Sequence, residues 1–145
     1  MADVLILNGP NLNMLGVREP HLYGTATLAD VEALCRDKAG VLGLAIDFRQ
    51  SNHEGELVTW IQQARGKIRG LIINAAAYTH TSVAILDALK LLNNVPIIEV
   101  HLTDPKAREE FRHTSYIEMV ASHTIAGHGP EGYVLALEHL SGIMP

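Results

Sequence analysis

Val4-Leu-Ile-Leu7 is a run of four apolar residues, and the next apolar residues fall at helical spacing between Leu28 and Leu42. The short apolar run predicts a strand, and the spacing of three to four residues that follows predicts an amphipathic helix. Thr25 and Thr27 precede this helix and are candidates to cap its first turn. The chain is therefore expected to begin with a strand and then a helix.

The same alternation continues to the end of the chain. Further strands are expected over Ala45 to Arg49, Leu71 to Ile73, Val95 to Val100 and Thr124 to Ala126. Further helices are expected after a cap at Ser51 or Asn52, from about Ser82 to Leu92, from Asp104-Pro105 onward, and from about Glu131 to Leu140.

Five strand-then-helix units predict a parallel sheet, because parallel strands need long crossover connections, which are usually helical and right-handed. We therefore expect an α/β fold, a flavodoxin-like three-layer sandwich in which helices cover both faces of a five-stranded parallel sheet. The length of 145 residues fits a single domain. In such sheets ligands bind beyond the carboxyl ends of the strands, so this edge is where we expect the site.

Composition excludes several classes of function. The net charge of -5 and the scattered basic residues argue against a nucleic-acid partner. No apolar run approaches the ~18–20 residues of a membrane span, and no signal sequence is recognisable, so we expect no membrane partner and a cytoplasmic protein. Cys35, the only cysteine, falls on or beside the apolar stripe of its helix and is interpreted as a core thiol.

The first loop, Asn8 to Gly24, is unusually long and carries Arg18 and Tyr23. Loops well above about 4–6 residues in compact domains are usually functional or disordered. A nearby cation favours the ionised form of a phenol, so Tyr23 beside Arg18 is a candidate general base. The alternative is a surface tyrosine with Arg18 in solvent.

Glu99 and His101 lie two apart in the fourth predicted strand, so both point to the same face. A carboxylate beside an imidazole can orient it as an acid catalyst, although a structural ion pair has the same spacing. Asn74 and His80 flank a loop of small residues that lets a ligand approach the backbone; His80 could instead belong to a helix start. Arg112 is either a clamp for an oxygen-rich ligand or a solvated cation.

Gly127-His-Gly-Pro-Glu-Gly132 has the letters of a dinucleotide-binding fingerprint. That motif belongs to the first strand-helix unit and needs an acidic residue about 20 positions later, which lies beyond the chain end. We interpret it as a tight turn into the last helix.

Two classes of protein with the same topology remain as alternative functions: a flavin-binding electron carrier and a receiver module without catalysis. A flavin carrier needs a phosphate loop rich in hydroxyl groups, but the first loop has no Ser or Thr between Asn8 and Gly24. A receiver needs acidic residues where this chain has Asn8 and Asn74.

Taken together, several blocks of sequence resemble type II 3-dehydroquinate dehydratases over essentially the whole chain. The blocks are Leu5-Ile-Leu-Asn-Gly-Pro-Asn-Leu-Asn-Met-Leu-Gly16, Arg18-Glu-Pro, Tyr23-Gly, Gln50-Ser-Asn-His-Glu-Gly-Glu56, Asn74 with Tyr78-Thr-His-Thr-Ser82, Glu99-Val-His101 and Arg108-Glu-Glu-Phe-Arg112. The resemblance implies conversion of 3-dehydroquinate to 3-dehydroshikimate in the shikimate pathway, by anti elimination of water through an enolate and without metal or cofactor.

The resemblance also implies catalytic roles. Tyr23, as a tyrosinate beside Arg18, would remove the proton next to the ketone. Asn11 would help to hold a water that stabilises the enolate. His101 would protonate the departing hydroxyl, and Glu99 would orient His101.

Substrate-binding roles follow from the same resemblance. Asn74 and the backbone amides of Leu102 and Thr103 would bind the substrate carboxylate, while His80 and Arg112 would hold ring hydroxyls. Asp87 would reach the site of a neighbouring subunit, because family members assemble as trimers that build a homododecamer. A lid over about residues 18–25 would close on the substrate.

The chain departs from the family pattern in two places. Thr103-Asp104 stands where Ser-Asn is more familiar, and Ala75-Ala76 stands where many members have Pro-Gly. We expect Asp104 to cap the turn that starts at Pro105 and to point away from the substrate.

Overall fold

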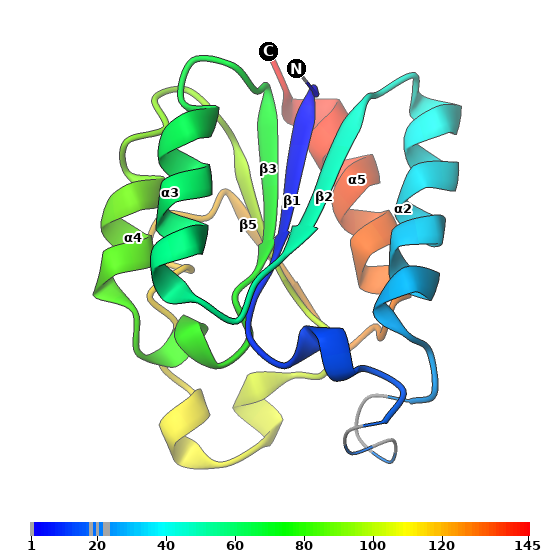
Figure 1. Cartoon of the computed structure of the whole chain (residues 1–145), viewed down its shortest axis with the longest axis vertical. Coiled ribbons are helices and arrows are strands. Elements are labelled where there is room, and N and C mark those ends of the chain that lie inside the picture. Colours follow the sequence, from blue (N-terminus) through cyan, green and yellow to red (C-terminus); the bar gives the residue numbers. More distant parts are fainter. Residues whose placement is uncertain (1, 18, 20, 22–23) are drawn as a thin grey trace.

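The computed structural model describes residues 2–17, 19, 21 and 24–145, and it contains one parallel sheet (Figure 1). The strands are β1 (Val4–Asn8), β2 (Ile46–Gln50), β3 (Gly70–Asn74), β4 (Ile97–His101) and β5 (His123–Ala126). Their order across the sheet is β2-β1-β3-β4-β5. This is the flavodoxin-like order, and it confirms the predicted fold class.

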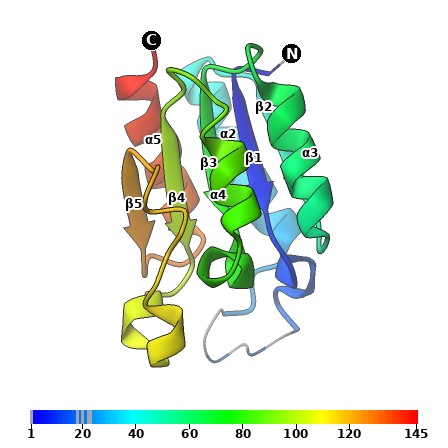
Figure 2. The same ribbon diagram turned by 90° about the vertical axis from the view of Figure 1, so that its left-hand side faces the viewer.

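Helices cover both faces of the sheet (Figures 1 and 2). One face carries α2 (Leu28–Leu42) and α5 (Glu131–Ile143), and the other carries α3 (Glu54–Ala64) and α4 (Val83–Leu89). Alternation along β1 supplies both cores, because Val4 and Ile6 pack under the first helix pair and Leu5 and Leu7 under the second. The central strands β1, β3 and β4 are therefore buried along their whole length.

Local capping sets the helix starts. Thr27 and Asp30 form a capping box at the start of α2, which confirms Thr27 as a cap. The Ser82 side chain accepts the Ile85 amide at the start of α4, where the sequence predicts that a helix begins. The predicted cap of α3 is wrong. His53 holds the cap position, and the Ser51 hydroxyl, two residues before it, accepts the His53 amide at 2.9 Å and not an amide of the first helical turn.

The connection from β4 to β5 also differs from expectation, because the structure has no α-helix there among these described residues. It has two short 3₁₀ helices, η3 (Pro105–Ala107) and η4 (Glu110–Arg112). Residues 105–112 are mostly charged, and their one large apolar side chain, Phe111, is exposed, so they have no apolar stripe to bury against the sheet. Asp104 does cap η3, as predicted, by accepting the Lys106 amide at 3.0 Å.

The carboxyl ends of the strands bring distant polar residues together. Asn8 and Asn74 are register partners across β1 and β3, and Ile73 pairs with Glu99 across β3 and β4. The 3₁₀ helices η1 (Leu12–Met14), η2 (Ala76–His80), η3 and η4 gather at this end, opposite the start of β1 and the end of α5 (Figure 1). The loops that follow the strands, and the polar residues they carry, therefore lie together at this end of the sheet.

Within the described ranges, no helix has the length and apolar character needed to cross a membrane. Arg18 and Tyr23 lie outside the described residues. The single catalytic domain with a lid over about residues 18–25 stays a prediction, as does the cytoplasmic location.

Candidate active site

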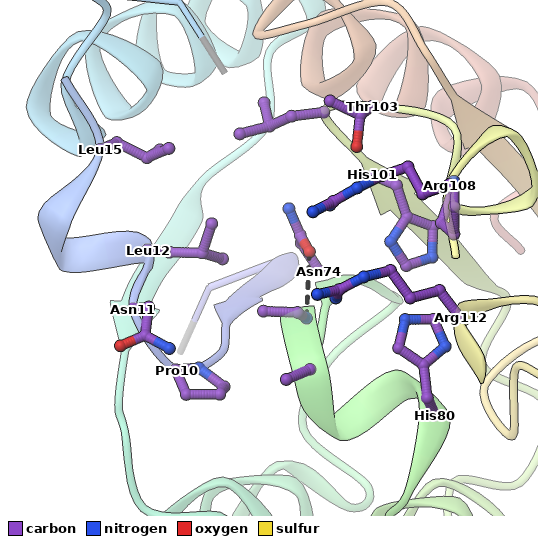
Figure 3. Close-up of a pocket in the computed structure, with 14 residues that line it drawn as sticks. Pro10, Asn11, Leu12, Leu15, Asn74, His80, His101, Thr103, Arg108 and Arg112 are labelled. Carbon is purple, nitrogen blue, oxygen red and sulfur yellow. Dashed lines mark hydrogen bonds between the residues drawn. The ribbon is translucent and has the colours of Figure 1, made fainter. Parts of the chain in front are cut away.

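A pocket of about 70 Å³, here called the main pocket, opens at the carboxyl ends of β3 and β4 (Figure 3). Most of the predicted site residues line it: Asn11, Asn74, His80, His101, Leu102, Thr103 and Arg112. Pro10, Leu12 and Leu15 form an apolar wall that faces the basic side chains (Figure 3). The pocket thus combines an apolar side with a polar and cationic side, as small-molecule sites usually do.

Glu99 and His101 form the buried pair that their spacing predicts. His101 Nε2 lies 2.6 Å from Glu99 Oε2, and the two residues are 8% and 1% exposed. Burial opposes ionisation of Glu99, but hydrogen bonds from His101, Ser115 and Thr124 together outweigh it, so the pKa of Glu99 lies below its usual value. An ionised carboxylate only accepts, so His101 Nε2 carries the proton and Nδ1 is left for a ligand.

His80 is held in one tautomer. Its Nδ1 lies 2.7 Å from the carbonyl oxygen of Thr114, which can only accept, so Nδ1 carries the proton. Burial is the main cause that lowers the pKa of His80 below its usual value, and it favours the neutral ring. Neutral His80 then offers Nε2 as an acceptor, which suits a ligand hydroxyl group.

Asn74 is fixed by a buried network at the ends of β1 and β3. Its Nδ2 donates to the Tyr133 hydroxyl at 3.0 Å, and that hydroxyl donates to Asn8 Oδ1 at 2.7 Å. Asn74 Oδ1 accepts the Ala76 amide at 3.2 Å (Figure 3). One N–H of the Asn74 amide group remains beyond these bonds, and it can serve a ligand in the pocket.

The turn after β4 orients two backbone amides. The carbonyls of His101 and Leu102 accept the amides of Gly127 and Gly129, at 3.3 and 2.9 Å. In a trans peptide the N–H points opposite to the C=O, so the amides of Leu102 and Thr103 point away from this glycine turn. Gly127 and Gly129 have φ of 83° and 59°, so the segment is the tight turn into α5 that the sequence predicts.

Two arginines supply positive charge to the main pocket. Arg112 was predicted, and its Nε also donates to Glu109 Oε2 at 3.1 Å. Arg108 was missed, although its side chain is only 15% exposed and its guanidinium points into the pocket beside that of Arg112 (Figure 3). The signal for it was present in the sequence, because Arg108 stands at the other end of the block that contains Arg112.

Comparison with known proteins identifies the family. The family model described as dehydroquinase class II matches residues 2–141. The chain belongs to the class II dehydroquinase family. It is 56% identical to the 3-dehydroquinate dehydratase of Streptomyces avermitilis, over 98% of this chain and 89% of that protein, and 57% identical to that of Brucella canis, over 97% and 88%. The type II dehydroquinase structure from Propionibacterium acnes superposes with a TM-score of 0.91, at 45% identity and 98% coverage of both chains.

These comparisons confirm the predicted resemblance and do not support a flavin carrier or a receiver module. Asn8 and Asn74, which stand where a receiver has acidic residues, are part of a neutral hydrogen-bonded network in this class II dehydroquinase.

Four predicted residues do not line the main pocket: two lie elsewhere in the structure, and two fall outside the described residues. Glu99 lies behind His101 and does not line the pocket. Asp87 lies exposed on α4, away from the pocket of its own chain, so a role in a neighbouring subunit stays a prediction. Tyr23 and Arg18 lie outside the described residues, and their roles in this class II dehydroquinase also stay predictions.

Asn11 occupies a strained turn at the edge of the main pocket. Its φ of 69° is in the left-handed region, which asparagine tolerates better than most residues, and its amide donates to Asn52 Oδ1 at 2.9 Å. Gly9, two residues earlier, is required by a close approach, because a Cβ there would lie 2.4 Å from the carbonyl oxygen of Ala75. Among the described residues, no cluster of three or more His, Cys, Asp or Glu could hold a metal ion.

Proposed function

We propose that the chain is a 3-dehydroquinate dehydratase, which removes water from 3-dehydroquinate to give 3-dehydroshikimate in the shikimate pathway. Membership of the class II dehydroquinase family supports this proposal, as do the names of its relatives. The single observation that carries it is the buried Glu99–His101 pair at the pocket, a proton donor with a fixed partner. The reaction is proposed to need neither metal nor cofactor.

The first chemical step is removal of the proton on the carbon next to the ketone. In this proposal Tyr23, ionised by the nearby Arg18, takes the proton, and the electron pair of the C–H bond forms an enolate. A water held by Asn11 stabilises the negative charge that develops on the enolate oxygen. The Asn52 contact to the Asn11 backbone supports this role, because it fixes the turn that carries the side chain.

The second step is loss of the hydroxyl group. The enolate electrons form the new carbon–carbon double bond and the C–O bond breaks. His101, protonated on both ring nitrogens, gives its Nδ1 proton to the departing oxygen, which leaves as water, and keeps its Nε2 proton hydrogen-bonded to Glu99. Glu99 stabilises the imidazolium before the transfer and keeps the ring in place. Elimination is anti, with the base and the acid on opposite faces of the ring.

Substrate binding is assigned to the rest of the pocket wall. Asn74 and the amides of Leu102 and Thr103 bind the carboxylate, and His80 and Arg112 hold ring hydroxyls. The neutral tautomer of His80 supports an acceptor role toward a hydroxyl group. We add Arg108 to the group that attracts the negatively charged substrate. Closure of the lid over about residues 18–25 would exclude water.

We also infer self-association as trimers that build a homododecamer, with Asp87 reaching a neighbouring site. Asp87 is exposed on α4, and two large apolar side chains, Phe111 and Met119, are 67% and 63% exposed. Light scattering coupled to size exclusion should give a mass of twelve 15.8 kDa chains. A monomer at micromolar concentration would contradict this assembly.

The activity is tested by adding 3-dehydroquinate and following the ultraviolet absorbance of the conjugated enone product. Wild-type protein should generate the absorbance, and Tyr23→Phe should abolish most of it because phenylalanine cannot accept a proton. Tyr116→Phe is the matched control, since Tyr116 does not line the main pocket and its variant should keep full turnover. Full turnover in Tyr23→Phe would refute the assigned base.

A dehydratase that works through a Schiff base would need a desolvated lysine at the site. The four lysines, Lys38, Lys67, Lys90 and Lys106, all belong to the described residues and none lines the main pocket. Borohydride added with the substrate should therefore leave the activity intact. Covalent trapping of the substrate on the protein would contradict the enolate route.

A further inference from the structure

Glu99 is held by more than its partner imidazole. Its Oε2 accepts from His101 Nε2 and from the Ser115 hydroxyl, both at 2.6 Å, and its Oε1 accepts from the Thr124 hydroxyl at 3.0 Å. The residue is 1% exposed, so little water is available to solvate its charge. Because a buried carboxylate is costly unless it is hydrogen-bonded, these two hydroxyls supply solvation that water cannot.

The Ser115 hydroxyl has its direction set by a second bond. Its oxygen accepts the Glu118 amide at 3.0 Å, so its single proton is the one that points to Glu99. The flanking backbone is also fixed, because the Thr114 carbonyl accepts from His80 and the Tyr116 amide donates to the Thr79 carbonyl at 2.9 Å. The short segment 114–116 therefore ties the buried carboxylate to the loop that carries His80.

The Thr124 hydroxyl is placed by the sheet itself. Thr124 and Glu99 are register partners on the neighbouring strands β5 and β4. Side chains of register partners stand on the same face, so the hydroxyl of Thr124 reaches the carboxylate oxygen that His101 leaves unoccupied. A shift of β5 by one residue would turn this hydroxyl to the other face.

We propose that Ser115 and Thr124 are positioning residues for the dehydration, which hold Glu99 in the orientation and the ionised state that keep His101 ready to donate its proton. This inference rests on the proposed function. A carboxylate that lost both hydroxyls would have one partner for two oxygens, and it would rotate toward solvent or take up a proton. Either change removes the negative charge that stabilises the imidazolium.

A second cavity, of about 160 Å³, supplies the space for such a rotation. It is lined by Ser115, Thr124 and Glu118, and Glu99 and His101 form part of the same wall. The carboxylate and the two hydroxyls therefore border the same space, which is large enough for several waters. With both in place, Glu99 faces His101.

The kinetic test compares Ser115→Ala, Thr124→Val and the double variant with wild type. General acid catalysis contributes roughly 10²–10⁴-fold, so partial loss in the double variant should lower kcat by at least ~10-fold. KM should change by less than ~2-fold, because neither hydroxyl lines the main pocket. Ser115→Thr and Thr124→Ser keep the hydroxyls and should recover most of the turnover, which a merely structural role would not require.

Ser122→Ala is the matched control. The Ser122 hydroxyl is also hydrogen-bonded to β4, because its oxygen accepts the Ile97 amide at 3.3 Å, but it makes no hydrogen bond to Glu99. It should retain the wild-type kcat. If wild type turns over substrate and the double variant keeps its kcat, the positioning role is refuted while the proposed function stands. If wild type shows no turnover, the proposed function fails.

A crystal structure of the double variant tests whether Ser115 and Thr124 hold Glu99 in place, independently of the reaction. Glu99 should leave the position 2.6 Å from His101 Nε2 and turn into the second cavity. An unchanged Glu99–His101 contact would overturn the inference, even in a protein with no measured activity.

Discussion

Tyr133→Phe removes one hydroxyl from the centre of the buried network that fixes Asn74. Tyr133 is 0% exposed, and it contributes its ring to the core under α2 and α5. Burial raises the pKa of Tyr133 well above its usual value, so the phenol stays protonated and acts only as a neutral donor and acceptor. Phenylalanine keeps the ring and its packing, so the variant isolates the hydroxyl.

The size of the effect follows from what loses its partner. Asn8 Oδ1 loses a donor at 2.7 Å and Asn74 Nδ2 loses an acceptor at 3.0 Å. Each buried polar group left without a partner costs about 1–3 kcal/mol. Some relaxation of the two amides is expected, so the free energy of unfolding should fall by about 2–4 kcal/mol.

Urea unfolding at fixed protein concentration measures this difference, with the fluorescence of Trp60, the only tryptophan, as the signal. Tyr78→Phe is the matched control, because its hydroxyl donates to the Asn52 carbonyl at 2.7 Å in an exposed position. That variant should lose less than about 1 kcal/mol, since water replaces the bond. Equal losses in the two variants would refute the claim that the network is a buried, fully paired unit.

Four further predictions concern single side chains. Ala76 has a φ of 51°, so Ala76→Gly should raise the free energy of unfolding by ~0.5 kcal/mol. Ala77 has no positive φ to relieve, so Ala77→Gly should lower the free energy of unfolding by ~0.5–1 kcal/mol. Urea unfolding measures both, and a loss of stability in both variants would contradict backbone strain at Ala76. Burial raises the pKa of Cys35 to about 12, so a thiol reagent at pH 8 should label the chain only after unfolding, and rapid native labelling would show the thiol to be accessible. Asp104→Asn should keep the cap and leave KM within about 2-fold of wild type, and a large gain in affinity would show that the charge reaches the substrate. Because burial lowers the pKa of His80, the folded state disfavours its charged form, and the stability that this residue contributes is lost as the pH falls from 6.5 through the folded pKa. When urea unfolding midpoints are measured over a pH series, His80→Gln should flatten this part of the curve. An unchanged slope would contradict the lowered pKa of His80.

The sequence predicted most of the fold because its signals are local. Apolar runs and helical spacing located every strand of the sheet to within about two residues, and Thr27 caps α2 as expected. The missing helix after β4 shows the limit of local signals. The turn that starts at Asp104-Pro105 is predicted correctly, but a turn continues as an α-helix only when a stripe of apolar side chains can be buried. Residues 108–112 offer one large apolar side chain, Phe111, and it is 67% exposed.

The site residues that lie at the carboxyl ends of strands could be predicted from the sequence. Asn74, Glu99 and His101 follow from the alternation of buried strands and the rule that ligands bind beyond their carboxyl ends. Ser115 and Thr124 carried no such signal. The hydroxyl of Ser115 reaches Glu99 through the conformation of an irregular loop, and that of Thr124 through the register of an edge strand, and neither is fixed by nearby residues alone.

The pair Asn8 and Asn74 shows why amides stand at the centre of this sheet edge. Tyr133 offers one proton and accepts another, and the two asparagines match it with one acceptor and one donor. Two carboxylates in register at these positions would compete for a single phenol proton and repel each other in a space that water does not reach. The residues that argue against a receiver module are thus the same ones that a neutral, fully paired network requires, and a substrate carboxylate can approach this edge without meeting a negative charge there.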